Sequence, residues 1–228
     1  MIRLTSQQRI VLAVCLPLVL FFVGLSLWHG VRAAWGDAMT LSARWLVAEW
    51  RENNGPAFTP ALWVQAHDDL RDGLRITPDN PQLYDDLGYL HASRAQAIGP
   101  TEADTPLGKY QRQLLDDAID HYRVATRLRP TLPYSWVYLA KAKELRGQLD
   151  AELWQAFDKA LKLGSGEAAV RLVLVEIACA HWNNLPTVRQ NGITNLLAIT
   201  PPHHRSKLVS VAKAKNCPVL MAKAPDAH

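Results

Sequence analysis

The chain has few cysteines, and their positions exclude several kinds of site. Its 228 residues include three, Cys15, Cys179 and Cys217. None of these stands close enough to another to form a zinc knuckle or a CxxC redox motif. The sequence also lacks a Ser-His-Asp arrangement and a complete phosphate-binding loop. It therefore predicts no bound cofactor, no metal and no enzymatic activity.

Beyond its N-terminal segment the chain lacks a surplus of either charge. Residues 1–35 contain three of the 25 basic residues and none of the 21 acidic ones, which leaves 22 against 21 for the remainder. Binding to nucleic acid requires a basic face on the protein. We therefore expect no nucleic-acid partner.

One segment lacks charge altogether. Residues 10–28 contain no charged side chain, and a helix needs roughly 20 apolar residues to cross a membrane. We expect a transmembrane helix over residues 10–31, after a cytoplasmic N-terminal tail over residues 1–9. Arg3 and Arg9 precede the segment and favour an N-in orientation. In a bacterial cell this predicts a single-pass inner-membrane protein with its soluble domain in the periplasm.

Two other interpretations of this segment remain. A signal peptide would be cleaved after the small residues Val31 and Ala33, but the apolar core is longer than such signals normally have. A lipoprotein signal ending at Cys15 fits less well, because Val14 is bulky and the apolar run continues past the cysteine. The length of the run favours a permanent anchor.

The rest of the sequence has little of the alternating pattern typical of strands, whereas apolar residues recur at spacings of three and four. This predicts an all-α fold. One spacing occurs twice, with offsets 0, 4, 7 and 12. Its members are Ala66, Leu70, Gly73 and Pro78 in the first copy and Ala118, Tyr122, Ala125 and Pro130 in the second.

These offsets resemble the second helix of a tetratricopeptide repeat (TPR), in which small residues let two helices approach closely. The first helix of such a repeat carries a large residue, then a leucine and a small residue. Matching positions are Tyr84, Leu87 and Gly88, then Trp136, Leu139 and Ala140, and Phe157 and Ala160 continue the second pair.

The resemblance covers about residues 40–163. It implies a TPR-like α-solenoid of helical hairpins over residues 36–200, behind the single transmembrane helix, with a C-terminal helix and basic tail over residues 201–228. A further pair of helices is expected over residues 167–181 and 185–199.

The spacing between Gly88 and Ala118 departs from the repeat pattern. It is thirty residues, whereas a standard repeat has about twelve. Residues 97–108 contain several glycines and prolines, which predicts a loop flanked by lengthened helices. This insertion is either a binding element or a tolerated surface loop.

A more specific resemblance rests on residues 128–136 and 147–153, together with residues 180–182 and the closing Asn216 and Cys217. These blocks are similar to short membrane-anchored TPR proteins of bacterial exopolysaccharide biosynthesis, the VpsP type. The resemblance implies a scaffold beside a polysaccharide polymerase or export complex. The alternative is a TPR adaptor of another envelope machine, for cytochrome maturation, pilus assembly or secretion, or less favourably a glycan-binding domain.

Candidate site residues follow from the expected concave groove, whose wall is formed mostly by first helices. The groove residues that would bind a partner protein are Tyr89, Arg94, Tyr138, Lys141 and Glu144. Tyr134 and Trp136 are expected to be packing aromatics rather than a platform for sugars.

Two smaller groups of residues have structural interpretations. Asp116 and Asp120 are expected to form solvated ion pairs with arginines one turn away on the same helix. Cys179 and Cys217 are a candidate disulfide in an oxidising compartment, where closing the loop between them would stabilise the fold by about 3 to 4 kcal/mol.

Overall fold

The computed structural model describes residues 6–52 and 54–217. Over these residues the chain is all-helical, with nine α-helices, one short 3₁₀ turn and no strand. It divides into two compact units, residues 1–80 and 81–228. The expected all-α class is therefore confirmed. The TPR assignment stays a prediction, and its expected range of residues 36–200 spans parts of both units.

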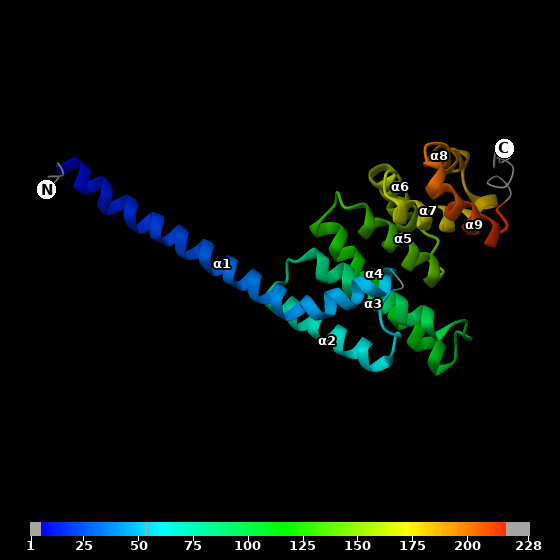
Figure 1. Cartoon of the computed structure of the whole chain (residues 1–228), viewed down its shortest axis with the longest axis horizontal. Helices are drawn as coiled ribbons and strands as arrows, with labels where there is room; N and C mark the ends of the chain where they lie inside the picture. Colours follow the sequence, from blue (N-terminus) through cyan, green and yellow to red (C-terminus); the bar gives the residue numbers. More distant parts are fainter. Residues whose placement is uncertain (1–5, 53, 218–228) are drawn as a thin grey trace. The chain divides into compact units, whose positions relative to one another are not determined.

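The first unit contains α1 (Ser6–Glu52) and α2 (Pro60–Ile76). The early part of α1 is long and apolar enough to span a membrane by length and composition. The helix continues without a break past residue 31, where the sequence suggested that the span ends, and its later part packs against α2 (Figure 1). Orientation and compartment stay predictions, and residues 1–5 of the expected N-terminal tail lie outside the described residues.

Contacts within this unit hold the later part of α1 on α2. Ala43, Val47 and Trp50 of α1 are buried. The indole N–H of Trp50 donates to the carbonyl of Pro56 at 2.8 Å, and Arg32 Nε donates to the carbonyl of Ile76 at the end of α2. A cation at a helix C-terminus satisfies a carbonyl that has no partner inside the helix.

The second unit contains the remaining helices, which Figure 1 shows in green to red. Their bounds are α3 (Pro81–Ile98), α4 (Pro106–Leu128), α5 (Pro133–Arg146), α6 (Ala151–Gly164), α7 (Ala168–Ala180), α8 (Thr187–Ala198) and α9 (Pro202–Ala214), with the 3₁₀ turn Trp182–Asn184 before α8. Successive helices pack as neighbours, α3 with α4 and α5 with α6. Their apolar faces form a continuous core that includes Tyr122, Phe157 and Leu174.

Local sequence signals set where these helices begin and end. Five of the nine described helices begin at a proline, whose fixed φ suits the first turn and whose missing N–H is not needed there. Thr105 caps α4 by accepting from the amide of Gly108 at 3.0 Å, and Asp150 caps α6 in the same way at Leu153. Gly147 ends α5 with a φ of 78°, a left-handed conformation that glycine adopts without strain.

The predicted insertion is a short loop between long helices. The loop over residues 99–105 joins α3 and α4, which have 18 and 23 residues where α5 and α6 have 14 each. Gln111 secures the loop, because its amide nitrogen donates to the carbonyls of Ala95 and Gly99 at 2.8 Å. The expected lengthening of the flanking helices is thus confirmed.

Gly88 of α3 lies against the ring of Tyr122 in α4. A Cβ atom at this position would lie 2.8 Å from two carbons of the Tyr122 ring, closer than real contacts allow. Tyr122 is itself buried. Glycine is therefore required here for packing, because any side chain would push the two helices apart.

We expect Gly88→Leu to destabilise the second unit by about 1–3 kcal/mol, since the added carbons overpack the contact with Tyr122. Thermal unfolding of the purified full chain, followed by circular dichroism, measures the change. Gly166→Leu is the matched control, because a Cβ at Gly166 meets no atom within 4 Å. Equal melting temperatures for the two variants would contradict the close contact.

Candidate functional site

In the second unit α3 contacts α5, and α5 contacts α7, so that the three helices follow one another in series. The five predicted groove residues lie on two of these helices. Tyr89 and Arg94 are on α3, and Tyr138, Lys141 and Glu144 are on α5. All five are partly buried. That these residues line a groove and bind a partner stays a prediction.

A polar cluster joins α5 to α7. Lys141 Nζ lies 2.9 Å from both Glu144 and Glu176. Glu144 in turn lies 3.6 Å from Nε2 of His181, which follows the last residue of α7. We call Lys141, Glu144, Glu176 and His181 the α5–α7 cluster. It brings two predicted groove residues together and holds α7 in place beside α5.

Two members of the α5–α7 cluster were not among the predicted groove residues. Glu176 and His181 lie 35 and 40 residues beyond Lys141, and nothing in their local sequence indicates that they meet it. The one signal in the sequence was that both residues fall within the helix predicted over residues 167–181, the first helix of the further predicted pair. Stacking of the predicted helix pairs would place α7 next to α5, but it does not indicate which side chains of α7 meet Lys141 and Glu144.

The other predicted residues take different roles. Tyr138 stacks on the buried Tyr122, with ring centroids 5.9 Å apart, so part of its face is used in packing. Arg94 has no ion pair with another residue in the described part of the chain. Its charge is thus available to a partner, whereas Lys141 and Glu144 satisfy each other.

The aromatics that would form a sugar platform are instead used in packing. Trp136 is partly buried, and its indole N–H donates to the carbonyl of Pro130 at 2.8 Å. The hydroxyl of Tyr134 donates to Glu167 at 2.8 Å. Burial and then this hydrogen bond raise the pKa of Tyr134 to about 12. Both rings pack against the core, as the sequence predicts for them.

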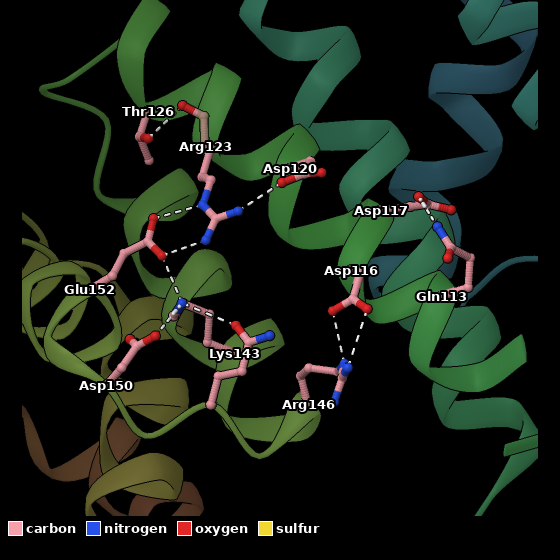
Figure 2. Close-up of polar contacts among 11 residues, drawn as sticks. Gln113, Asp116, Asp117, Asp120, Arg123, Thr126, Lys143, Arg146, Asp150 and Glu152 are labelled. Carbon is pink, nitrogen blue, oxygen red and sulfur yellow. Dashed lines mark hydrogen bonds and ion pairs between the residues drawn. The ribbon is translucent and has the colours of Figure 1, made fainter. Parts of the chain in front are cut away.

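A second polar network joins α4 with α5 and α6, and Figure 2 shows its members. At its centre is Lys143, whose side chain is 1% exposed. Its ammonium lies 2.7 Å from Glu152 and 2.9 Å from Asp150. Glu152 also accepts two hydrogen bonds from Arg123, at 2.6 and 2.7 Å. The buried cation is therefore neutralised by two carboxylates, as burial of a charge requires.

These contacts shift the pKa values of Glu152, Asp150 and Arg123. The hydrogen bond from Arg123 contributes most to lowering the pKa of Glu152 from 4.5 to about 2, and the bond from Lys143 adds to it. Burial would raise the pKa of Asp150, but hydrogen bonds from the Leu153 amide and from Lys143 outweigh it and lower the value. The pKa of Arg123 is raised, chiefly by its bond to Glu152. All three groups stay charged at neutral pH.

The ion pairs expected for the acidic residues of α4 are present, with one different partner. Asp120 pairs with Arg123 on its own helix at 2.8 Å, as predicted. Asp116 pairs with Arg146 of α5, also at 2.8 Å, rather than with an arginine one turn away (Figure 2). Local spacing reports only neighbours on the same helix, so it does not predict a pair between two helices.

The two cysteines of the candidate disulfide are neighbours. Cys179 in α7 and Cys217 after α9 are both buried and are free thiols. Burial raises the pKa of Cys179, and a hydrogen bond with Cys217 raises it further. The tertiary structure therefore brings the thiols together, and oxidation to a disulfide stays a prediction.

Comparison with known proteins does not extend these observations. No family model matches the chain, and no curated protein matches it. The class that the fold itself defines is an all-helical protein with one N-terminal helix long and apolar enough to span a membrane. Within the described residues, no group of three or more His, Cys, Asp or Glu side chains is placed to hold a metal ion.

We expect stability to fall as the pH drops from about 4.5 towards 2, because Glu152 has a pKa near 2 when folded and 4.5 as its ordinary value. A lowered acid pKa contributes stability above the ordinary value and loses it on protonation. Glu152→Gln should reduce the slope of the melting temperature over this range. Glu102→Gln, at an exposed acid without an ion pair among the described residues, should not. Identical slopes in both variants would contradict the role of Glu152.

From the expected periplasmic location, in which neighbouring thiols oxidise, we predict a disulfide between Cys179 and Cys217 in protein isolated from native membranes with its thiols blocked during lysis. Mass spectrometry of the unreduced protein detects the linked peptides. Reduction should then lower the melting temperature of the protein. The Cys15→Ser variant should show the same difference in melting temperature between its oxidised and reduced forms. Full alkylation of both cysteines before reduction would contradict the pairing.

Proposed function

We propose that the chain is a noncatalytic, membrane-anchored helical adaptor that binds a partner protein along α3, α5 and α7. The supporting observation is the serial contact of α3 with α5 and of α5 with α7. Helix pairs packed on a continuous core present a preformed surface. Such a surface binds a peptide or a partner domain at a low cost in conformational entropy.

The polar groups on these helices support recognition of a charged partner. The α5–α7 cluster is largely internally neutralised, and the side chains of Lys141 and Glu144 are only 14% and 13% exposed. They therefore stabilise the shape of the surface more than they offer free charge. Arg94 on α3 is the free cation of the predicted set, which favours an acidic group on the partner.

The N-terminal helix supports attachment to a membrane, since its early part has the length and composition of a span. Arg3 and Arg9 favour an N-in orientation, with the helical units in the periplasm of a bacterial cell. The likeness of residues 128–136 and 147–153 to exopolysaccharide proteins then favours a scaffold in polysaccharide biosynthesis or export. The pathway rests on this likeness alone.

Crosslinking the full-length protein in its native membrane, followed by mass spectrometry of the captured proteins, tests the function. Recovery of a polysaccharide polymerase, a chain-length regulator or an export component would support the scaffold. Recovery of pilus, secretion or cytochrome-assembly components would retain the adaptor and overturn the polysaccharide pathway. Release of the protein from membranes by alkaline carbonate would overturn the anchor.

We expect Arg94→Glu to reduce capture of the partner, because it reverses the one free charge of the predicted groove set. Arg127→Glu is the matched control. Arg127 is an exposed residue in the last turn of α4, and it has no ion pair with another described residue. Quantitative crosslinking yield is the measurement, and both variants should melt like the parent. Equal loss of capture in both would indicate a general charge effect and contradict a binding role of Arg94.

A further inference from the structure

α1 carries an apolar face that the described chain leaves exposed. The face follows a seven-residue repeat through four heptads, and no charged residue interrupts it. Its positions, which we call the heptad face, are Leu20, Gly24, Leu27, Val31, Ala34, Ala38, Leu41, Trp45 and Ala48. Every one of them is exposed, including Leu41 at 67% and Trp45 at 59%. Sustained apolar heptads are the pattern of a coiled coil.

The heptad face is distinct from the face of α1 that packs on α2. Gly36, Ala43 and Trp50 are buried, and they occupy the position of the same repeat that points away from a coiled-coil seam. α1 therefore has two apolar faces on opposite sides, and α2 covers one of them. The other lacks a cover although it contains large side chains.

The hydrocarbon core of a bilayer is too thin to cover the whole length of the heptad face. A helix rises 1.5 Å per residue, so the face from Leu20 to Ala48 is about 42 Å long, whereas the hydrocarbon core of a bilayer is roughly 30 Å thick. If the span begins at Ile10, as the uncharged run suggests, about 20 residues take it to Gly30. Leu41 then lies about 16 Å beyond the hydrocarbon and Trp45 about 22 Å. An exposed apolar stripe in water indicates a protein interface.

We propose that a second copy of this chain covers the heptad face, so that two α1 helices form a parallel, in-register coiled coil running from the membrane to the start of the folded units. The parallel direction rests on the proposed anchor, since every copy then crosses the membrane in the same sense. Two identical helices in register place each apolar position opposite its equivalent, and the face is therefore complementary to itself.

The positions that flank the seam complement one another in this arrangement. In a parallel coiled coil the residue at g contacts the residue at e five positions later on the other helix. Arg44 at g thus meets Glu49 at e, which gives an ion pair of opposite charges. Glu49 has no ion pair with another described residue of its own chain, while Arg44 lies 3.0 Å from Asp37. The charge pattern therefore fits two copies in this register.

Bulk and polarity are matched in the same way at the other flanking positions. Two heptads closer to the N-terminus, Trp35 at e faces Gly30 at g, where a Cβ added to the glycine would meet no atom within 4 Å. Between these pairs, Asp37 at g faces Ser42 at e, a carboxylate opposite a hydroxyl donor. An antiparallel pair of helices would not bring these residues together.

Disulfide crosslinking in native membranes tests the proposal with the full-length chain. Ala34→Cys and Ala38→Cys place a thiol on the heptad face, and Ala33→Cys, one residue away, places it off the face. All three are made with Cys15→Ala, and the buried Cys179 and Cys217 are kept. After mild oxidation we expect a dimer band on a non-reducing gel for Ala34→Cys and Ala38→Cys, and a strongly reduced one for Ala33→Cys.

Two results would overturn the proposal. One is equal crosslinking at all three positions, which indicates random collision in the membrane. The other is failure of all three to crosslink while each is inserted and expressed like the parent. Membrane extraction of the same samples with carbonate reports separately on the anchor, so that loss of the anchor and loss of the dimer are distinguished.

The register is tested by exchanging charges. Glu49→Arg places arginines at both flanking positions and should weaken the Ala38→Cys dimer band, whereas Arg44→Glu combined with Glu49→Arg should restore it. Leu41→Glu, which buries a carboxylate in the seam, should abolish the band, and Ala33→Glu should not. Failure of the double exchange to restore crosslinking would refute the parallel register.

Discussion

The close approach of α3 to α4, where Gly88 lies against the ring of Tyr122, is the contact on which the second unit depends. Because Gly88 has no side chain, Tyr122 is buried between these helices and also stacks on Tyr138 of α5. The position of α5 in turn sets where α7 packs, through Lys141 and Glu176. A single helical hairpin cannot bury its own apolar face, so each pair is stable only through the next.

The two polar networks of this unit have different consequences. Lys143 is almost fully buried and requires both Glu152 and Asp150, so that the network fixes how α4, α5 and α6 meet. The α5–α7 cluster has no member as deeply buried as Lys143, and it joins α5 to α7. The first network mainly specifies the packing. The second shapes the surface that we propose for a partner, and leaves Arg94 as its free charge.

The N-terminal helix joins a segment long and apolar enough to span a membrane to the first folded unit. Its early part has the composition of a span, and its later part belongs to the first folded unit, without a break between them. A continuous helix transmits the direction of the anchor to α2, which packs on one face. The opposite face is apolar for longer than a bilayer is thick, and this excess is what points to a second helix rather than to lipid alone.

The sequence by itself determined the helical class, the apolar segment and most helix ends, because periodicity, prolines and caps act over one or two turns. It also indicated the close packing at Gly88 and the long helices around residues 99–105. Only the tertiary structure decided that Asp116 pairs with Arg146, that Glu176 and His181 join Lys141 and Glu144, and that Cys179 lies beside Cys217. These partners are separated by 30 to 40 residues, and which long side chains meet depends on how successive helices are rotated and offset, a property of the whole core rather than of any local pattern.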